Sequence, residues 1–249
     1  MAILALDAST ASVVFGMYDM FRAAGRDWGI IVEGRPGAAC LDAAIVAREL
    51  APLTLANGVR IEPHAAIADD AAFDVVCVPE LAIMPDEPLD GRFAPEVEWL
   101  RRQHARGAIV AAACSGAVLL AEAGLLDDCD ATTHWAFCDA LAQRYPRVRV
   151  HRDRALVVAG EGQRLVMAGG GTTWLDLALY LVARAVDLET AMQLARVNLI
   201  DWHAVGQQPF ARLSRTRQVD DAVIGRCQEW IAKHYAASAP VASMVRLSG

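Results

Sequence analysis

A single cysteine occupies a position where a thiol could do chemistry. Cys114 directly follows the apolar run 108–113, short enough for a buried parallel strand, and precedes a helical segment at 116–123. At a strand-to-helix turn a nucleophile projects from the carboxyl edge of the sheet, beside a helix N-terminus that can lower the pKa of a thiol. We therefore expect Cys114 to be solvent-accessible, on a strained turn and next to a ligand pocket. A buried structural cysteine is the alternative.

Two other polar side chains could act with this thiol. His134 lies 20 residues after Cys114 and could generate a thiolate if the two side chains meet; a hydrogen-bonded structural histidine is the alternative. Glu80 follows the predicted strand 73–78, so it should point to the same edge of the sheet. There it could bind a cationic ligand or raise the pKa of a neighbouring thiol, or it could be a solvated loop carboxylate.

Alternating strands and helices must position these side chains. Two strands that flank Gly160-Glu161-Gly162 predict a hairpin, and the alternation as a whole predicts an α/β fold with a mostly parallel sheet. The apolar patterns predict strands at 2–6, 28–32, 53–55, 59–61, 73–78, 108–113, 155–159 and 164–168, and helices at 11–25, 95–104, 116–123, 172–184 and 188–197.

The segments around the cysteine resemble one family. Residues 114–127 (CSGAVLLAEAGLLD), 131–135 (ATTHW) and 145–148 (YPRV) are similar, in this order, to the amidotransferase-like (ThiJ/PfpI-like) sensor domain of AraC-type transcriptional regulators. Residues 176–179 and 206–210 (GQQPF) match the same family, so the resemblance covers nearly the whole chain. It implies a doubly wound, mostly parallel sheet sandwiched by helices, with class I glutamine amidotransferase-like, flavodoxin-like layering.

The resemblance also implies a division of the chain. Residues 1–211 would form the ligand-sensing domain, 212–219 a linker, and 220–249 the start of a helix-turn-helix DNA-binding domain that is cut short, so we expect the natural protein to be longer. Six basic and three acidic residues follow from Arg212 onward, in a chain whose net charge is −7. This basic end favours an appended anion-binding module, and a solvated tail is the alternative.

Two positions depart from the enzymes of the wider superfamily. Those enzymes carry an acid on the first helix, where Ser12 and Val13 stand here, and a Gly-rich turn that donates an oxyanion hole, where residues 79–81 (PEL) stand here. The resemblance therefore implies a non-catalytic pocket that senses a small molecule. Its candidate ligand-binding residues are Ser12, Val13, Glu80, Leu81, Cys114, Ser115, His134 and Trp135.

The resemblance thus implies an AraC-family regulator. Its partners would be a small-molecule effector, promoter DNA through the C-terminal module, and a second copy in a homodimer. Glu80 favours a cationic group and the helix N-terminus after Cys114 favours an anionic one, so we expect a zwitterionic or amide-bearing effector. The main alternative is a ThiJ/PfpI-type cysteine hydrolase or hydratase with Cys114 as nucleophile and His134 as its partner. A third is an oxidative sensor in which Cys114 forms sulfenic acid.

Composition excludes several other classes. Hydrophobic residues make up 55% and charged residues 21%, which excludes a disordered chain. The longest uncharged stretch, 107–121, is shorter than the roughly 20 residues of a membrane span, and no basic segment precedes the apolar start, so we expect a cytoplasmic protein without membrane contact. The six cysteines form no Cys-x-x-Cys pair, and we expect neither a metal nor a cofactor.

Overall fold

The computed structural model describes residues 1–69, 71–201 and 245. The chain divides into two compact units, Met1–Leu213 and Ser214–Gly249, and the elements named below belong to the first. The interpretations of residues 206–210, of the linker and of the helix-turn-helix segment 220–249 lie outside the described residues.

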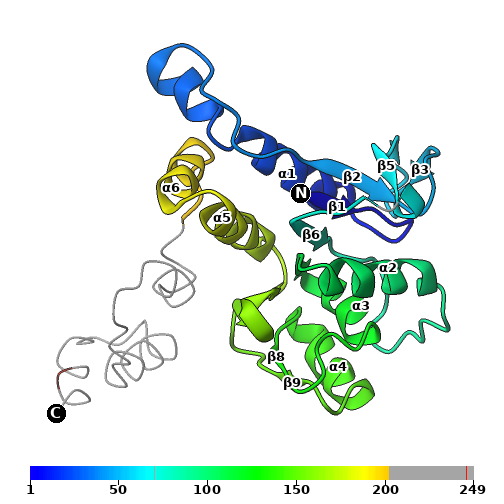
Figure 1. Ribbon diagram of the computed structural model, residues 1–249. Helices are drawn as coiled ribbons and strands as arrows, with labels where there is room; N and C mark the ends of the chain where they lie inside the picture. Colours follow the sequence, from blue (N-terminus) through cyan, green and yellow to red (C-terminus); the bar gives the residue numbers. More distant parts are fainter. Residues whose placement is uncertain (70, 202–244, 246–249) are drawn as a thin grey trace. The chain divides into compact units, whose positions relative to one another are not determined.

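A seven-stranded sheet lies at the centre of the first unit (Figure 1). Its order is β10-β11-β7-β6-β1-β2-β5, and all neighbouring pairs are parallel except β10 and β11. The predicted α/β fold with a mostly parallel sheet is therefore confirmed, as is the hairpin. The strands are β1 (Ala2–Leu4), β2 (Ala44–Ala47), β5 (Ala65–Ala66), β6 (Val75–Val78), β7 (Ile109–Ala113), β10 (Leu156–Ala159) and β11 (Leu165–Ala168).

Helices cover both faces of this sheet. Successive strand residues point to opposite faces, so Ile3 packs in one core layer and Leu4 in the other. The layer around Ile3 contains α1 (Ala11–Ala23), α5 (Thr173–Ala185) and α6 (Leu188–Val197), and the layer around Leu4 contains α2 (Ala94–Ala105) and α3 (Ala117–Glu122) (Figure 1). Apolar strands buried on both faces explain the uninterrupted hydrophobic runs in the sequence.

Shorter elements surround this core. The predicted strands at 53–55 and 59–61 are confirmed, but they pair with each other as β3 (Leu53–Thr54) and β4 (Arg60–Ile61), outside the main sheet. A second small sheet joins β8 to β9. The remaining short elements are η2 (Ile67–Asp69), η3 (Cys114–Gly116), β8 (Asp130–Ala131), η4 (Trp135–Phe137), α4 (Cys138–Arg144), β9 (Arg149–Val150) and η5 (Glu161–Gln163).

The strand predicted at 28–32 is wrong. This segment forms a turn of π-helix, η1 (Gly29–Glu33), closed by Gly34 in the left-handed conformation, whose backbone N–H bonds to Gly29 O. Gly29 permits a close return of the chain, because a Cβ there would lie 2.7 Å from Arg35 O. The β-branched run that resembles a strand is instead exposed at Ile31 and its neighbours.

No helix within residues 1–69 and 71–201 is long and apolar enough to span a bilayer.

Candidate functional site

Cys114 begins a tight turn at the carboxyl end of β7. Its φ angle is +55°, a left-handed conformation that is unfavourable for a residue with a Cβ, so the predicted strained turn is present. The Cys114 N–H donates to Gly169 O (3.0 Å), which extends the pairing of β7 with β11 by one residue. Thr133 Oγ1 donates to Cys114 O (2.7 Å). These two bonds fix the backbone of the turn.

The next residue ties this turn to the loop after β6. Ser115 is buried; its Oγ accepts from the Leu81 N–H (2.8 Å) and donates to Leu81 O (2.7 Å). The same loop reaches the start of α1, because the Thr10 N–H donates to Glu80 O (3.2 Å). The loops after β1, β6 and β7 are thus joined by hydrogen bonds. The hydroxyl of Ser115 is occupied within the protein.

The thiol itself is buried and protonated. Cys114 is only 5% exposed, so the expectation of a solvent-accessible thiol is wrong. Burial and, to a smaller extent, the negative charge of Glu80 raise the pKa of Cys114 to about 11, although hydrogen bonds from the backbone and side chain of Ser115 and from the Gly171 N–H act in the opposite direction. The pKa is raised overall because desolvation outweighs these hydrogen bonds.

His134 lies beside the glycine loop that follows β11. A Cβ on Gly170 would lie 1.8 Å from His134 Cδ2, so only glycine fits against the imidazole. The adjacent Gly171 N–H is the one that contacts the thiol, and this loop therefore connects the histidine with the cysteine. Nδ1 of His134 accepts from the Ala136 N–H (3.2 Å) and caps η4. The imidazole is also packed against Trp135, whose side chain is 67% exposed.

The two candidates on the first helix lie in different environments. Val13 is buried in the core layer of α1 and α5, whereas Ser12 is exposed. Neither supplies a carboxylate to the thiol. Among the described residues, Glu80 is the acidic group that influences the pKa of Cys114, and it opposes ionisation.

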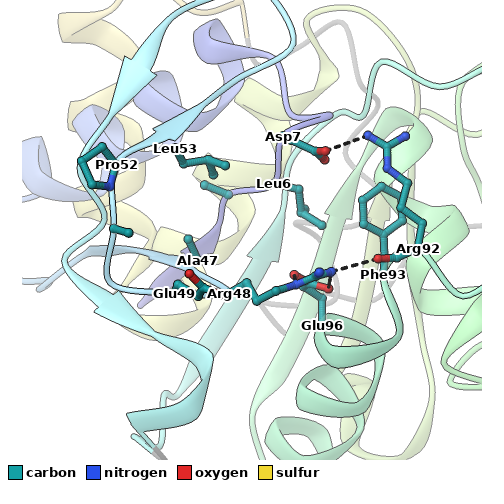
Figure 2. Close-up of a pocket in the computed structure, with 12 residues that line it drawn as sticks. Leu6, Asp7, Ala47, Arg48, Glu49, Pro52, Leu53, Arg92, Phe93 and Glu96 are labelled. Carbon is teal, nitrogen blue, oxygen red and sulfur yellow. Dashed lines mark hydrogen bonds and ion pairs between the residues drawn. The ribbon is translucent and has the colours of Figure 1, made fainter.

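A cavity of about 260 Å³ opens at the ends of β1 and β2 (Figure 2). It belongs to the same edge of the sheet as Cys114, but its lining includes none of the candidate ligand-binding residues. It is lined by Ala5, Leu6, Asp7, Ala47, Arg48, Glu49, Ala51, Pro52, Leu53, Arg92, Phe93 and Glu96.

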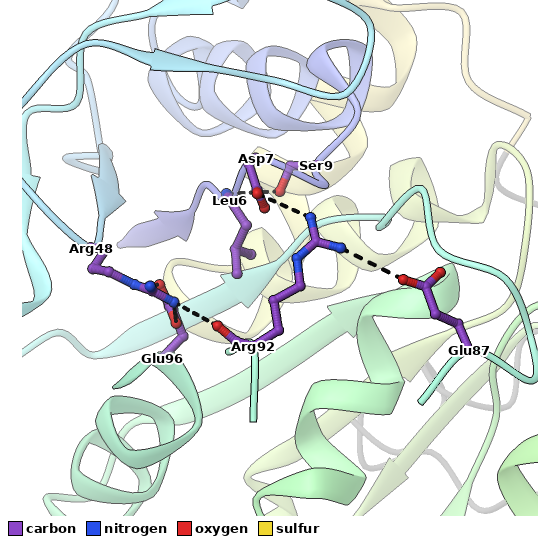
Figure 3. Close-up of polar contacts among 7 residues, drawn as sticks. All are labelled: Leu6, Asp7, Ser9, Arg48, Glu87, Arg92 and Glu96. Atoms are coloured by element: carbon purple, nitrogen blue, oxygen red, sulfur yellow. Dashed lines mark hydrogen bonds and ion pairs between the residues drawn. The ribbon is translucent and has the colours of Figure 1, made fainter. Parts of the chain in front are cut away.

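Two arginines provide the positive charge of this cavity. Arg48 donates from Nε and Nη2 to the two carboxylate oxygens of Glu96 (2.8 and 2.7 Å), and Nη2 also donates to Arg92 O (2.9 Å). The side chain of Glu96 is 4% exposed, and its bonds raise the pKa of Arg48. Arg92 forms an ion pair with Asp7 (3.0 Å) (Figure 3).

Analysis of the sequence alone missed these residues. The strand β2 was not predicted, so Arg48 and Glu49 were not assigned to the sheet edge. The available signal was the apolar run 43–47 followed at once by two charged residues, the pattern that drew attention to Glu80. Within the described residues, no group of three or more His, Cys, Asp or Glu side chains could hold a metal ion.

A doubly wound sheet with a cysteine on a strained turn after a central strand defines an amidotransferase-like α/β protein. The chain belongs to the DJ-1/PfpI family, whose model matches residues 17–184.

Relatives of two functional kinds are similar to this chain. An isonitrile hydratase from Pseudomonas putida is 34% identical over 159 residues, 62% of this chain and 64% of that protein. The HTH-type transcriptional regulator CdhR from Pseudomonas aeruginosa is 33% identical over 144 residues, 58% of this chain and 40% of the regulator. The chain thus spans less than two thirds of the length of either relative.

Solved structures share the fold. A ThiJ/PfpI family protein from Pseudomonas syringae superposes with a TM-score of 0.63 at 25% identity, over 81% of this chain and 74% of that one. An AraC family transcriptional regulator from Pseudomonas putida superposes with a TM-score of 0.61 at 18% identity, over 79% of this chain and 97% of that one. The second likeness shows the fold alone.

Proposed function

We propose that this chain is the effector-sensing part of an AraC-family, HTH-type transcriptional regulator and that it has no catalytic role. The similarity to the HTH-type regulator CdhR carries the regulator part of the proposal, and the buried, protonated thiol supports the absence of catalysis. With its pKa raised to about 11, Cys114 is almost entirely in the thiol form at pH 7. Because the thiolate and not the thiol is the nucleophile, this site is poorly suited to covalent catalysis.

The groups around the thiol support the same conclusion. A nucleophilic cysteine needs a neighbouring base or a lowered pKa. Here the neighbouring carboxylate, Glu80, opposes ionisation, and Nδ1 of His134 already accepts a hydrogen bond from the Ala136 N–H. The hydroxyl of Ser115 donates to Leu81 O and is not free to stabilise an oxyanion. The strained turn thus serves to shape the edge of the sheet.

The proposed regulator has three kinds of partner. A small-molecule effector would bind at the carboxyl edge of the sheet, promoter DNA would bind through a helix-turn-helix module that starts near residue 220, and a second copy would complete a homodimer that reads paired half-sites. An effector can act only if it binds one conformation of the protein better than another. Such a protein would work in the cytoplasm.

The test uses the complete product of the gene in its own cell. Deletion of the gene should change transcription from nearby promoters, and both the wild-type protein and Cys114→Ala should restore it. Transcription that is unaffected by deletion, or that a folded Cys114→Ala protein cannot restore, contradicts a non-catalytic regulator.

The second candidate function is an enzyme of the isonitrile hydratase kind. It is favoured by the 34% identity to that enzyme and by the left-handed conformation of Cys114. The purified chain can be assayed for hydration of isonitriles at pH 7 and pH 9, with Cys114→Ala as the matched control. Isonitrile hydration by the wild type that is lost in Cys114→Ala would support the enzyme and contradict the non-catalytic regulator.

A further inference from the structure

A groove lies between the turn η1 and the helix α6, which Figure 1 shows beside each other, the turn in blue beyond α1 and the helix in yellow. We propose that two copies of this chain associate through this face, each inserting η1 into the groove of the other. The inference rests on the proposed function for the biological role of the homodimer, whereas the surface itself is argued from exposure, packing and charge.

The groove has a volume of about 500 Å³ and a mostly apolar surface. It is lined by Trp28, Leu188, Glu189, Met192, Gln193 and Arg196. Leu188 and Met192 lie four residues apart on one face of α6, and both are exposed. The opposite face of α6, with Ala191 and Leu194, is buried in the core. The helix thus has two apolar faces, and within the described residues only one of them is buried.

The turn η1 forms an apolar ridge beside this groove. The side chains of residues 30–32 (IIV) are between 46% and 64% exposed. The turn is ordered, because the Arg35 N–H donates to Gly29 O (3.2 Å) and closes it. Contiguous exposed aliphatic side chains are typical of an interaction surface. A ridge whose conformation is fixed in advance loses little conformational entropy when it binds.

A second copy of the chain is the partner that this patch fits. Trp28 forms a wall of the groove, and the ridge begins two residues later, so ridge and groove belong to one continuous patch. In a two-fold dimer the same patch of both chains meets itself, which requires a surface that is complementary to itself. A ridge next to a groove meets this requirement. The contact is made twice, and the assembly closes at two chains.

The charges of the patch favour the same partner. The chain has a net charge of −7, so two copies repel each other in general. Glu33 and Arg35 beside the ridge and Glu189 and Arg196 at the groove give this patch a net charge of zero. Within residues 1–69 and 71–201 Arg196 forms no ion pair, and Glu33 reaches Arg35 only at 3.5 Å. Reciprocal insertion therefore places acidic and basic groups of one copy near groups of opposite sign on the other.

The patch leaves the site around Cys114 open. The strands β1 and β2 are parallel, so the chain must return to the amino edge of the sheet between them. The turn η1 lies in this return segment, after α1 and before β2. Cys114 lies at the carboxyl end of β7, the opposite edge. A dimer formed through η1 is thus compatible with a ligand at the carboxyl edge.

The experiment is sedimentation equilibrium of the complete chain over micromolar concentrations, where the wild type should have the mass of two 26.7 kDa chains. Ile31→Asp places a charge on the ridge and Met192→Asp places one in the groove. Each should raise the dissociation constant at least about tenfold, as loss of an anchoring contact in an interface does. Met84→Asp, an equally exposed methionine in the loop after β6, should leave it unchanged. Circular dichroism should show that all three variants fold, because these side chains are exposed in the single chain.

A mixture of Ile31→Asp and Met192→Asp distinguishes reciprocal insertion from other dimers. A mixed pair retains one unaltered ridge in one unaltered groove, whereas either variant alone retains none. The mixture should therefore associate more tightly than either component. A single-chain mass of the wild type at every concentration, a variant that dimerises as tightly as the wild type, or a mixture no tighter than its components would each overturn the interface.

The interface and the proposed function can fail separately. If the wild type is a single chain in solution but deletion of the gene changes transcription, the regulator stands and the interface is refuted. If both variants weaken the dimer and the mixture restores it, while deletion has no effect on transcription, the interface stands and the regulator is refuted.

Discussion

The side chain of Cys114 lies in surroundings that oppose its ionisation from two directions. It is excluded from water, and the nearby Glu80 carries a charge of the same sign as a thiolate. Helix N-termini activate thiols elsewhere, but here Cys114 is the first residue of the short turn η3, and the helix that follows, α3, has only six residues. Desolvation has the largest effect on the pKa of Cys114, because burial disfavours the charged thiolate.

We expect alkylation of Cys114 by iodoacetamide to be slow at pH 7 and to increase about tenfold per pH unit up to about pH 11, because only the thiolate reacts. Mass spectrometry of peptides gives the rate, with the exposed Cys40 as internal control. Glu80→Gln should move the midpoint to lower pH. A rate that is already constant below pH 9 would show that the thiol is activated after all.

The buried carboxylate of Asp176 in α5 lowers the stability of the fold at neutral pH. Its Oδ1 is buried and has no hydrogen-bond partner in the described structure, and burial, with a smaller effect of Asp201, raises its pKa to about 6. Since the folded pKa lies above the unfolded value, the stabilising protonated form is fully present below about pH 4 and is lost as the pH rises through 6.

Asp176→Asn should therefore increase the free energy of unfolding at pH 7 by about 1–3 kcal/mol, from a shift of about two pKa units at 1.36 kcal/mol each. Urea unfolding at pH 4, 5, 6 and 7 measures the free energy of unfolding of both proteins. This free energy should decrease less between pH 4 and pH 7 in Asp176→Asn than in the wild type. The exposed Asp86→Asn is the matched control. A stability loss at pH 7 would mean that the carboxylate has a role that its contacts do not reveal.

At the scale of elements, Gly116 sets how closely η3 approaches the end of β6. A Cβ there would lie 2.6 Å from Pro79 O and 2.7 Å from Val78 O, both backbone atoms that cannot rotate away. Gly116→Ala should destabilise the protein by about 1–3 kcal/mol, as overpacking does, and should also weaken the bonds between Ser115 and Leu81.

Urea unfolding of Gly116→Ala beside Gly169→Ala provides the measurement. An alanine at Gly169 would meet its nearest neighbour, Ala155 O, at an ordinary 3.6 Å, so this second variant should be nearly neutral. Equal stability of the two variants would show that the loop after β6 can move to accommodate a side chain.

Sequence patterns predicted the local features at the carboxyl edge of the sheet and missed the features that segments distant in the sequence form together. The turn at Cys114 was predictable because its strand, small residues and helix are contiguous. Strand β2 was missed because its alanines favour helices. The run 28–32 was assigned as a strand because β-branched residues favour strands. In both segments the packing of the folded protein decides the structure. The cavity was not predictable, since Arg48 and Glu96 meet across 48 residues of chain.

At the scale of the whole molecule, we expect two chains to associate. A regulator that reads paired half-sites needs two copies, and the described surface includes exposed apolar side chains on η1, at Ile30, Ile31 and Val32. Light scattering at micromolar concentrations should give the mass of two chains. A mass of one chain at every concentration argues against the homodimer, and Ile31→Ser tests whether η1 takes part.

The central position of β1 affects how the protein must be made. Residues 2–4 leave the ribosome before their strand partners, which follow only at residues 44–47 and 75–78. One edge of this apolar strand therefore stays unpaired while about forty further residues are synthesised, and the other while about seventy are, and such edges pair readily with other nascent chains. Yield in the cell should then depend on chaperones and on the speed of translation more than on the stability of the finished fold.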